Sequence, residues 1–220
     1  MLKSAILAVG DLMSKDFQGV LLKSIGLAVA LFILIFAGVE ALFWFLQFLP
    51  WTWAQDLLAV AAGLGLIVLF FFLMAPVTAL FAGLYLDDIA GKVEAQHYGR
   101  DAVGAGLSGL TAVKVSLQFG LLVLLINILA LPFVLTGVGA ILLIVINAYL
   151  ISREYFEMAA MRHMAVQDAR DFRKDNAASI FVAGFLPAVM ALFPLVNLLV
   201  PLFATSYFVH MFKALQRSSV

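Results

Sequence analysis

Residues 147–163, NAYLISREYFEMAAMRH, place charged side chains directly after an apolar stretch. The segment carries four charged residues and ends on His163. Two interpretations fit this pattern: the mouth of a path for ions, or a helix that leaves a membrane. Arg153 and Glu157 are spaced i, i+4, the spacing of an ordinary helical ion pair. The segment is therefore a candidate site whose meaning depends on the elements around it.

Polar side chains inside apolar stretches form a second group of candidates. Glu40 is the acid of the first long apolar stretch, and an ionisable residue at membrane depth is a functional candidate. It lies near the end of that stretch, so its carboxylate could instead extend to the interface. Amides in apolar surroundings need hydrogen-bond partners, which a neighbouring helix or a hydrated path could supply. The candidates of this kind for lining a path are Asn127, Asn147 and Asn197.

The chain offers little for catalysis, metal binding or cofactor binding. It has no cysteine, and His97, His163 and His210 share no local ligand spacing such as H-x-x-x-H. GAGLSG at 104–109 matches G-x-G-x-x-G, but it follows a polar helical pattern, so it predicts a loop and not a dinucleotide site. Neither a nucleophile elbow nor H-E-x-x-H occurs. We expect no enzyme activity, no cofactor and no metal.

The composition predicts a membrane protein. Of the 220 residues, 65% are hydrophobic and 12% are charged, and the mean hydropathy is +1.12. A soluble fold of this length could not bury so much apolar surface. The net charge is zero and no long basic or acidic tract occurs, so we expect the lipid bilayer and not nucleic acid as the partner.

Four apolar tracts must position the candidate residues: 20–46, 57–86, 117–150 and 178–212. A bilayer core needs about 20 helical residues, so the first two tracts each predict one full transmembrane helix. The last two are too long for one crossing and carry breakers near their middles, Pro132 to Gly139 and Pro187 to Pro201. We therefore expect an all-α membrane protein with two full spans and two partly inserted helical hairpins. Four crossings with two additional turns are the alternative.

The distribution of positive charge predicts the topology. All 13 lysines and arginines lie outside segment 47–56, and these residues concentrate in cytoplasmic segments. We expect segment 47–56 to face outward, and both termini and the segments 87–116 and 151–177 to be cytoplasmic. The chain reads as one integral membrane domain over residues 1–220: an interfacial N-terminal segment 1–19, a membrane core 20–212 and a tail 213–220.

The segment after the second tract predicts a helix that overhangs into the cytoplasm. Ile89, Val93 and His97 share one face of such a helix, and Asp88 and Lys92 form an i, i+4 pair on it.

Small residues recur at every fourth position in the second tract, at Ala75, Ala79 and Gly83. This pattern lets membrane helices approach closely, either inside one chain or between subunits. Two spans and two hairpins offer few residues to enclose a complete path, so we expect a homo-oligomer.

Three stretches resemble the bacterial CysZ family and its wider relatives of the etoposide-induced type: APVTALFAGLYLDDIAGKVEAQHYG, NAYLISREYFEMAAMRH and GFLPAVMALFPLVNLLVPLFATSYFVHMF. The resemblance covers most of residues 20–212. It implies an inner-membrane protein with two full spans and two partly inserted hairpins, assembled into oligomers, that passes sulfate without ATP. The charged segment 147–163 would then lie on the cytoplasmic side of an anion path.

The resemblance also implies an anion site near the start of the first span, where this sequence departs from the family. The family has a glycine, a leucine and paired arginines, whereas this chain reads DFQGVLLKSIGL. Sulfate is suited to bidentate arginine and to helix amides. The remaining anion-binding candidates are Lys15, Gly19 and Lys23, with Arg153 at the exit of the third tract. We expect an ATP-independent permease or channel for sulfate or a related small anion in the bacterial inner membrane. A helical membrane scaffold without transport activity is the alternative.

Overall fold

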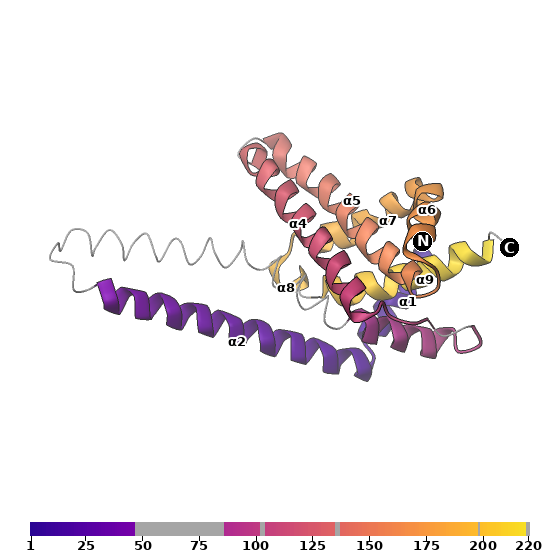
Figure 1. Cartoon of the computed structure of the whole chain (residues 1–220), viewed down its shortest axis with the longest axis horizontal. Helices are drawn as coiled ribbons and strands as arrows, with labels where there is room; N and C mark the ends of the chain where they lie inside the picture. Colours follow the sequence, from indigo (N-terminus) through magenta and orange to yellow (C-terminus); the bar gives the residue numbers. More distant parts are fainter. Residues whose placement is uncertain (47–85, 102–103, 135–136, 198, 219–220) are drawn as a thin grey trace.

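The computed structural model describes residues 1–46, 86–101, 104–134, 137–197 and 199–218. All regular structure in these residues is helical, which confirms the all-α prediction (Figure 1). Besides a helical segment at 86–97, the helices are α1 (Leu2–Leu12), α2 (Lys15–Leu46), α4 (Gly109–Val134), α5 (Gly137–Met161), α6 (Val166–Asp175), α7 (Ala177–Met190), α8 (Pro194–Asn197) and α9 (Val200–Ser218). The second tract up to residue 85, the segment 47–56 and the small-residue pattern at Ala75, Ala79 and Gly83 lie outside the described residues.

The two long apolar tracts near the C-terminus are each divided into shorter helices. Helix α4 ends at Val134 and α5 begins at Gly137, inside the stretch where the breakers predict a turn. The two helices pack against one another (Figure 1). The fourth tract is divided into α7, α8 and α9, with Pro194 as the first residue of α8. Proline fits the first turn of a helix because its missing N–H would have no partner there.

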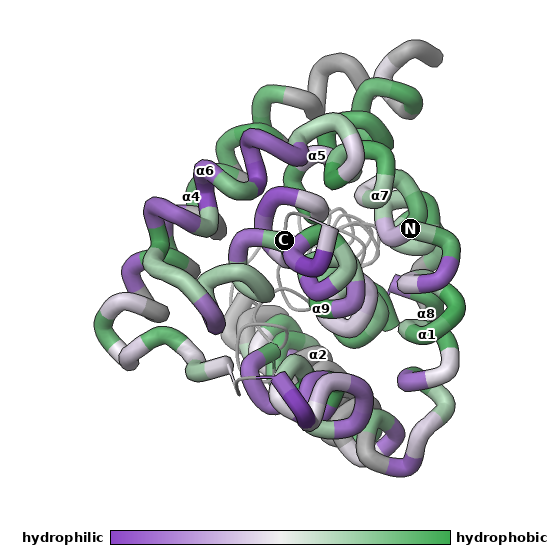
Figure 2. The backbone as a smooth tube through the Cα atoms, turned by 90° about the vertical axis from the view of Figure 1, so that its right-hand side faces the viewer, coloured by the Kyte–Doolittle hydropathy of each residue, from purple (hydrophilic) through white to green (hydrophobic). Residues whose placement is uncertain are grey.

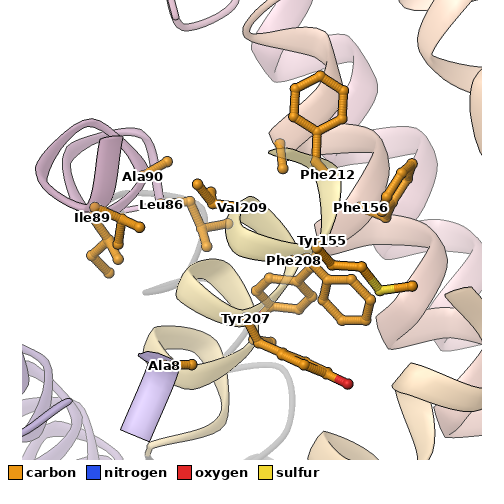
Figure 3. Close-up of a cluster of buried hydrophobic side chains, with 14 of the residues drawn as sticks. Ala8, Leu86, Ile89, Ala90, Tyr155, Phe156, Tyr207, Phe208, Val209 and Phe212 are labelled. Carbon is orange, nitrogen blue, oxygen red and sulfur yellow. The ribbon is translucent and has the colours of Figure 1, made fainter. Parts of the chain in front are cut away.

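Helix α9 is the centre of the bundle. All of its residues from Val200 to Lys213 are buried, because α1, α5 and α7 pack against it. Figure 3 shows Ala8 of α1, Ile89 of segment 86–97 and Phe156 of α5 on different sides of this helix. The ring of Phe156 meets Phe208 and Phe212 of α9 edge to face, with centroids 6.5 and 6.1 Å away. The core is thus built around the C-terminal helix α9, the last part of the fourth apolar tract.

Helices α5 and α7 approach each other closely at Gly184. A Cβ atom at this position would overlap the carbonyl oxygen of Ala148 and lie 2.8 Å from Cβ of Ser152. Only glycine leaves room for this contact, so Gly184 determines how closely the two helices pack.

Much apolar side-chain surface remains uncovered on the long helices. Helix α2 extends away from the bundle (Figure 1), and it exposes Leu22, Ile33, Leu34 and Phe36. Helix α4 exposes Leu117, Leu121, Leu125 and Leu129. Figure 2 shows α7 mainly in the green of apolar residues and α6 mainly in the purple of hydrophilic ones. In the part of the chain that the structure describes, no helix combines the length and the apolar character needed to cross a membrane.

Candidate functional site

Three arginines surround one glutamate where α5 meets α6, and we call Arg153, Arg170, Arg173 and Glu157 the arginine cluster. The Nε atom of Arg173 donates to Oε1 of Glu157 at 2.7 Å. The Nε atom of Arg153 lies 3.5 Å from the same oxygen, which confirms the predicted i, i+4 pair. The Nε atom of Arg170 is 3.8 Å from Oε2, is buried and has no hydrogen-bond partner. One carboxylate therefore faces three guanidinium groups, and one of these retains an unused donor.

A cavity of about 70 Å³ adjoins the arginine cluster. This volume is several times the roughly 10–15 Å³ that one water molecule needs. Arg153, Glu157 and Arg170 line it together with Glu154, and α4 contributes Gln118. The cavity thus combines guanidinium and amide donors with enough space for a small ligand.

Burial changes the charge of this cavity. Glu154 lies beyond the apolar tract that ends at residue 150, and burial raises its pKa to about 8. Near neutral pH its carboxyl group is therefore mostly protonated and uncharged. Three guanidinium groups then face the single carboxylate of Glu157, so the arginine cluster carries an excess of positive charge. Such a site favours an anion with several acceptor oxygens.

A second polar group, the Glu94 cluster, joins segment 86–97 to the end of α5 and comprises Glu94, Arg162, His163 and Gly104. Arg162 donates from Nε and Nη2 to the two oxygens of Glu94, at 3.1 and 3.2 Å. Nε2 of His163 lies 2.8 Å from Oε1. Burial alone would raise the pKa of Glu94, but the hydrogen bonds from Arg162 and His163 outweigh burial and lower it. This cluster is a buried, fully paired ionic network.

The glycine motif at 104–109 belongs to the Glu94 cluster and not to a nucleotide site. It leads from segment 86–97 towards α4, and no strand precedes it within the described residues. The amide of Gly104 donates to Oε2 of Glu94 at 3.2 Å, and its carbonyl accepts from Nη2 of Arg162 at 3.1 Å. A Cβ atom on Gly104 would lie 2.9 Å from atoms of Glu94, Arg162 and His163. The first glycine of the motif is therefore required for close packing.

A third polar group, the Asp11 cluster, lies at the C-terminal end of segment 86–97, about one turn beyond Glu94, and comprises Asp11, His97, Tyr98, Ser206 and His210. Nε2 of His97 lies 2.7 Å from Oδ1 of Asp11, and Nε2 of His210 lies 3.0 Å from Oδ2. Ser206 also donates to Oδ2. Burial alone would raise the pKa of Asp11, but the hydrogen bonds from His210, Ser206 and His97 outweigh it and lower the pKa.

The Asp11 cluster does not follow from ligand spacing along a single helix. His97 and His210 come from different helices, and packing brings them to one carboxylate. One signal was present: Asp11 is the only acidic residue in helix α1, whose other residues are apolar or glycine apart from Lys3 and Ser4. A lone carboxylate on such a helix requires partners from elsewhere in the fold.

The structure places the predicted site residues in different regions. Arg153 lines the cavity. Lys15 and Gly19 are exposed in the first two turns of α2. Lys23 lies on the same helix, but its side chain is outside the part of the chain that the structure describes. Glu40 is exposed further along α2. The amide residues are spread over three helices: Asn127 on α4, Asn147 half-buried on α5 and Asn197 half-buried at the end of α8.

Comparison with known proteins identifies a family. The family model described as Sulfate transporter CysZ/Etoposide-induced protein 2.4 matches residues 4–201, which include the arginine cluster and most of the bundle. A search of curated proteins found no match. The matching family is one of transporters and not of enzymes, and it points to a membrane protein with a sulfate-transporter-like role.

Proposed function

The chain belongs to the family of the sulfate transporter CysZ and etoposide-induced protein 2.4, and from this premise we propose that it is an ATP-independent permease for sulfate or a related small anion. The observation that carries the proposal is the arginine cluster beside its cavity. Arg153 and Arg170 reach the cavity from two helices, and the buried Nε of Arg170 lacks a hydrogen-bond partner. A bound oxyanion would supply the missing acceptor.

The charge of the cavity suits a dianion. Arg153, Arg170 and Arg173 face the single carboxylate of Glu157, and the raised pKa of Glu154 keeps that second glutamate mostly neutral near pH 7. Guanidinium groups bind oxyanions through pairs of parallel N–H donors. This site compensates for the arginine pair that the start of the first span lacks, with Lys15, Gly19 and Lys23 as a second anion-binding region on α2.

The proposed setting is the bacterial inner membrane. We place α2 and the second apolar tract as full spans, and the helices of the third and fourth tracts as two partly inserted hairpins. The exposed leucines of α4 and the exposed apolar side chains of α2 support this arrangement, because surfaces of this kind are normally covered by lipid or by another protein. Both termini and the arginine cluster would then lie on the cytoplasmic side. A homo-oligomer would cover part of α2 and complete the path.

Sulfate flux into liposomes containing the purified protein tests the proposal. We expect Arg170→Gln and Arg153→Gln each to lower flux several-fold at unchanged protein level, because each removes a guanidinium from the cavity. Lys23→Gln should also lower flux if the α2 region is the second site. Lys174→Gln is the matched control in α6, since its exposed side chain is paired with Asp171 at 2.7 Å and lies outside the cavity lining.

The outcome also separates the permease from its alternative. Well-folded wild-type protein that passes no sulfate would remove the permease proposal and favour a helical scaffold. Equal flux in wild type and in both arginine variants would remove the arginine cluster from the mechanism.

A further inference from the structure

We propose that Asp11, His97 and His210 form a binding site for a divalent transition-metal ion, with Zn²⁺ as the best-matched ion. The three side chains come from α1, segment 86–97 and α9, and each offers one ligand atom. These atoms all lie within 4.8 Å of one another. Two imidazoles and one carboxylate are a common protein ligand set for Zn²⁺ with a further position left for water. The inference is independent of the proposed transport function.

The distances require only small adjustments. Ligand atoms about 2.0–2.2 Å from a tetrahedral Zn²⁺ are separated from each other by roughly 3.4 Å. Nε2 of His97 and Nε2 of His210 now lie 2.7 and 3.0 Å from the Asp11 oxygens. Both Nε2 atoms thus point at the same carboxylate, and the two rings cross at 76° with centroids 4.8 Å apart. An ion inserted between these atoms would replace two hydrogen bonds with coordination bonds.

The surroundings already orient one of the ligands. The hydroxyl of Tyr98 lies 2.7 Å from Nδ1 of His210. Metal-bound histidines typically donate their other ring N–H to a polar group, which fixes the tautomer and the ring orientation. A tyrosine hydroxyl can both donate and accept, so Tyr98 satisfies Nδ1 of His210 with or without a metal. Ser206 holds Asp11 in place by donating to Oδ2.

The site is also accessible and electrostatically suited to a cation. The side chains of Asp11 and His210 are 2% and 1% exposed, whereas that of His97 is 25% exposed and connects the site to solvent. Asp11 supplies one carboxylate charge between the two histidine rings. Partial burial strengthens the attraction between this charge and a dication.

Zinc titration of the full-length protein in mild detergent, in competition with a chromophoric chelator, tests the site. We expect one Zn²⁺ per chain, with affinity lowered at least tenfold in His97→Gln and in His210→Gln. Tyr98→Phe should weaken binding by about tenfold, as loss of a partner that orients a ligand does. His163→Gln is the matched control, because the chain has three histidines and no cysteine, and His163 lies in the Glu94 cluster. Circular dichroism verifies that each variant is folded.

A second measurement covers the case in which a histidine variant fails to fold. Co²⁺ added to wild-type protein should give the intense visible absorption of a tetrahedral site, and Zn²⁺ should abolish it. The weak spectrum of hydrated Co²⁺ in wild type would overturn the proposal. Absence of stoichiometric Zn²⁺ binding in wild type would overturn it as well. So would folded His97→Gln and His210→Gln variants that bind Zn²⁺ with the affinity of wild type.

Discussion

Replacing Glu94 with glutamine tests whether the Glu94 cluster stabilises the bundle. The change keeps the shape of the side chain but removes its charge. The side chains of Glu94 and Arg162 are 5% and 7% exposed, so the variant leaves a buried guanidinium without its principal counter-ion. The amide NH₂ of glutamine would also face a donor, either Arg162 or the N–H of Gly104, where a carboxylate oxygen now accepts.

The expected loss of stability follows from these contacts. Removing one partner of a buried ion pair costs about 3–5 kcal/mol. Arg162 keeps its contact with Asp87 at 2.9 Å, but the side chain of Asp87 is 63% exposed and compensates only in part. We therefore expect a loss near the lower limit, about 3 kcal/mol. For a chain of this length the midpoint of thermal unfolding should fall by roughly 6–12 °C.

Thermal unfolding in mild detergent, followed by circular dichroism at a helix wavelength, measures this change. Asp88→Asn is the matched control, because it removes a carboxylate from the same helical segment. Its pair with Lys92 is 3.0 Å long and exposed, at 57% and 36%, and is worth only about 0.3–0.5 kcal/mol. Midpoints for the two variants within about 2 °C of each other would refute the argument that burial makes the Glu94 cluster strong.

Further predictions concern pH, packing and topology. Hydrogen bonds lower the pKa of Glu94 in the folded state. The stability that Glu94 contributes is therefore present above pH 4.5 and is lost as the pH falls from there through the folded pKa. Unfolding midpoints of Glu94→Gln should depend less on pH in this range than those of wild type. Sulfate flux should decrease as the pH rises through about 8, because ionisation of Glu154 then cancels positive charge in the cavity, and unchanged pH dependence in Glu154→Gln would contradict this. Gly184→Ala should destabilise the protein by about 1–3 kcal/mol in denaturant unfolding, because its methyl group would overlap the backbone of Ala148. A Lys174→Cys variant should not be labelled by an impermeant thiol reagent added outside intact cells, because we expect segment 151–177 to be cytoplasmic. Labelling of this cysteine would contradict that topology.

Local features of the fold could be predicted from the sequence. The pairs Asp88–Lys92 and Arg153–Glu157 are present because an i, i+4 spacing places two side chains together on any helix. Ile89 and Val93, predicted to share one face of a helix, are both buried, because helical periodicity determines which residues lie on the same face. These features depend on the helix alone, and the chain around them adds little.

Tertiary features lay beyond sequence reasoning. Arg170 and Arg173 were placed only in a cytoplasmic segment, because nothing in one sequence shows that α6 folds back beside Arg153. The partners of Glu94 are similarly remote, since Arg162 is 68 residues away along the chain. Helical periodicity predicts the face on which a residue lies, but not which helix covers that face.

The central position of α9 has a consequence for the order of events during synthesis. Asp11 of α1 contacts His210 of α9, which lies 199 residues later in the chain. At roughly 5–20 residues per second, the ribosome needs about 10–40 s to produce that partner. Helix α1 therefore spends this interval without the surface that covers it in the finished fold, while α4 and α5 can already pair. The side of α1 that waits carries Ser4, Ala8 and Asp11, so the buried polar contacts of this helix form only after nearly all of the intervening chain has been made.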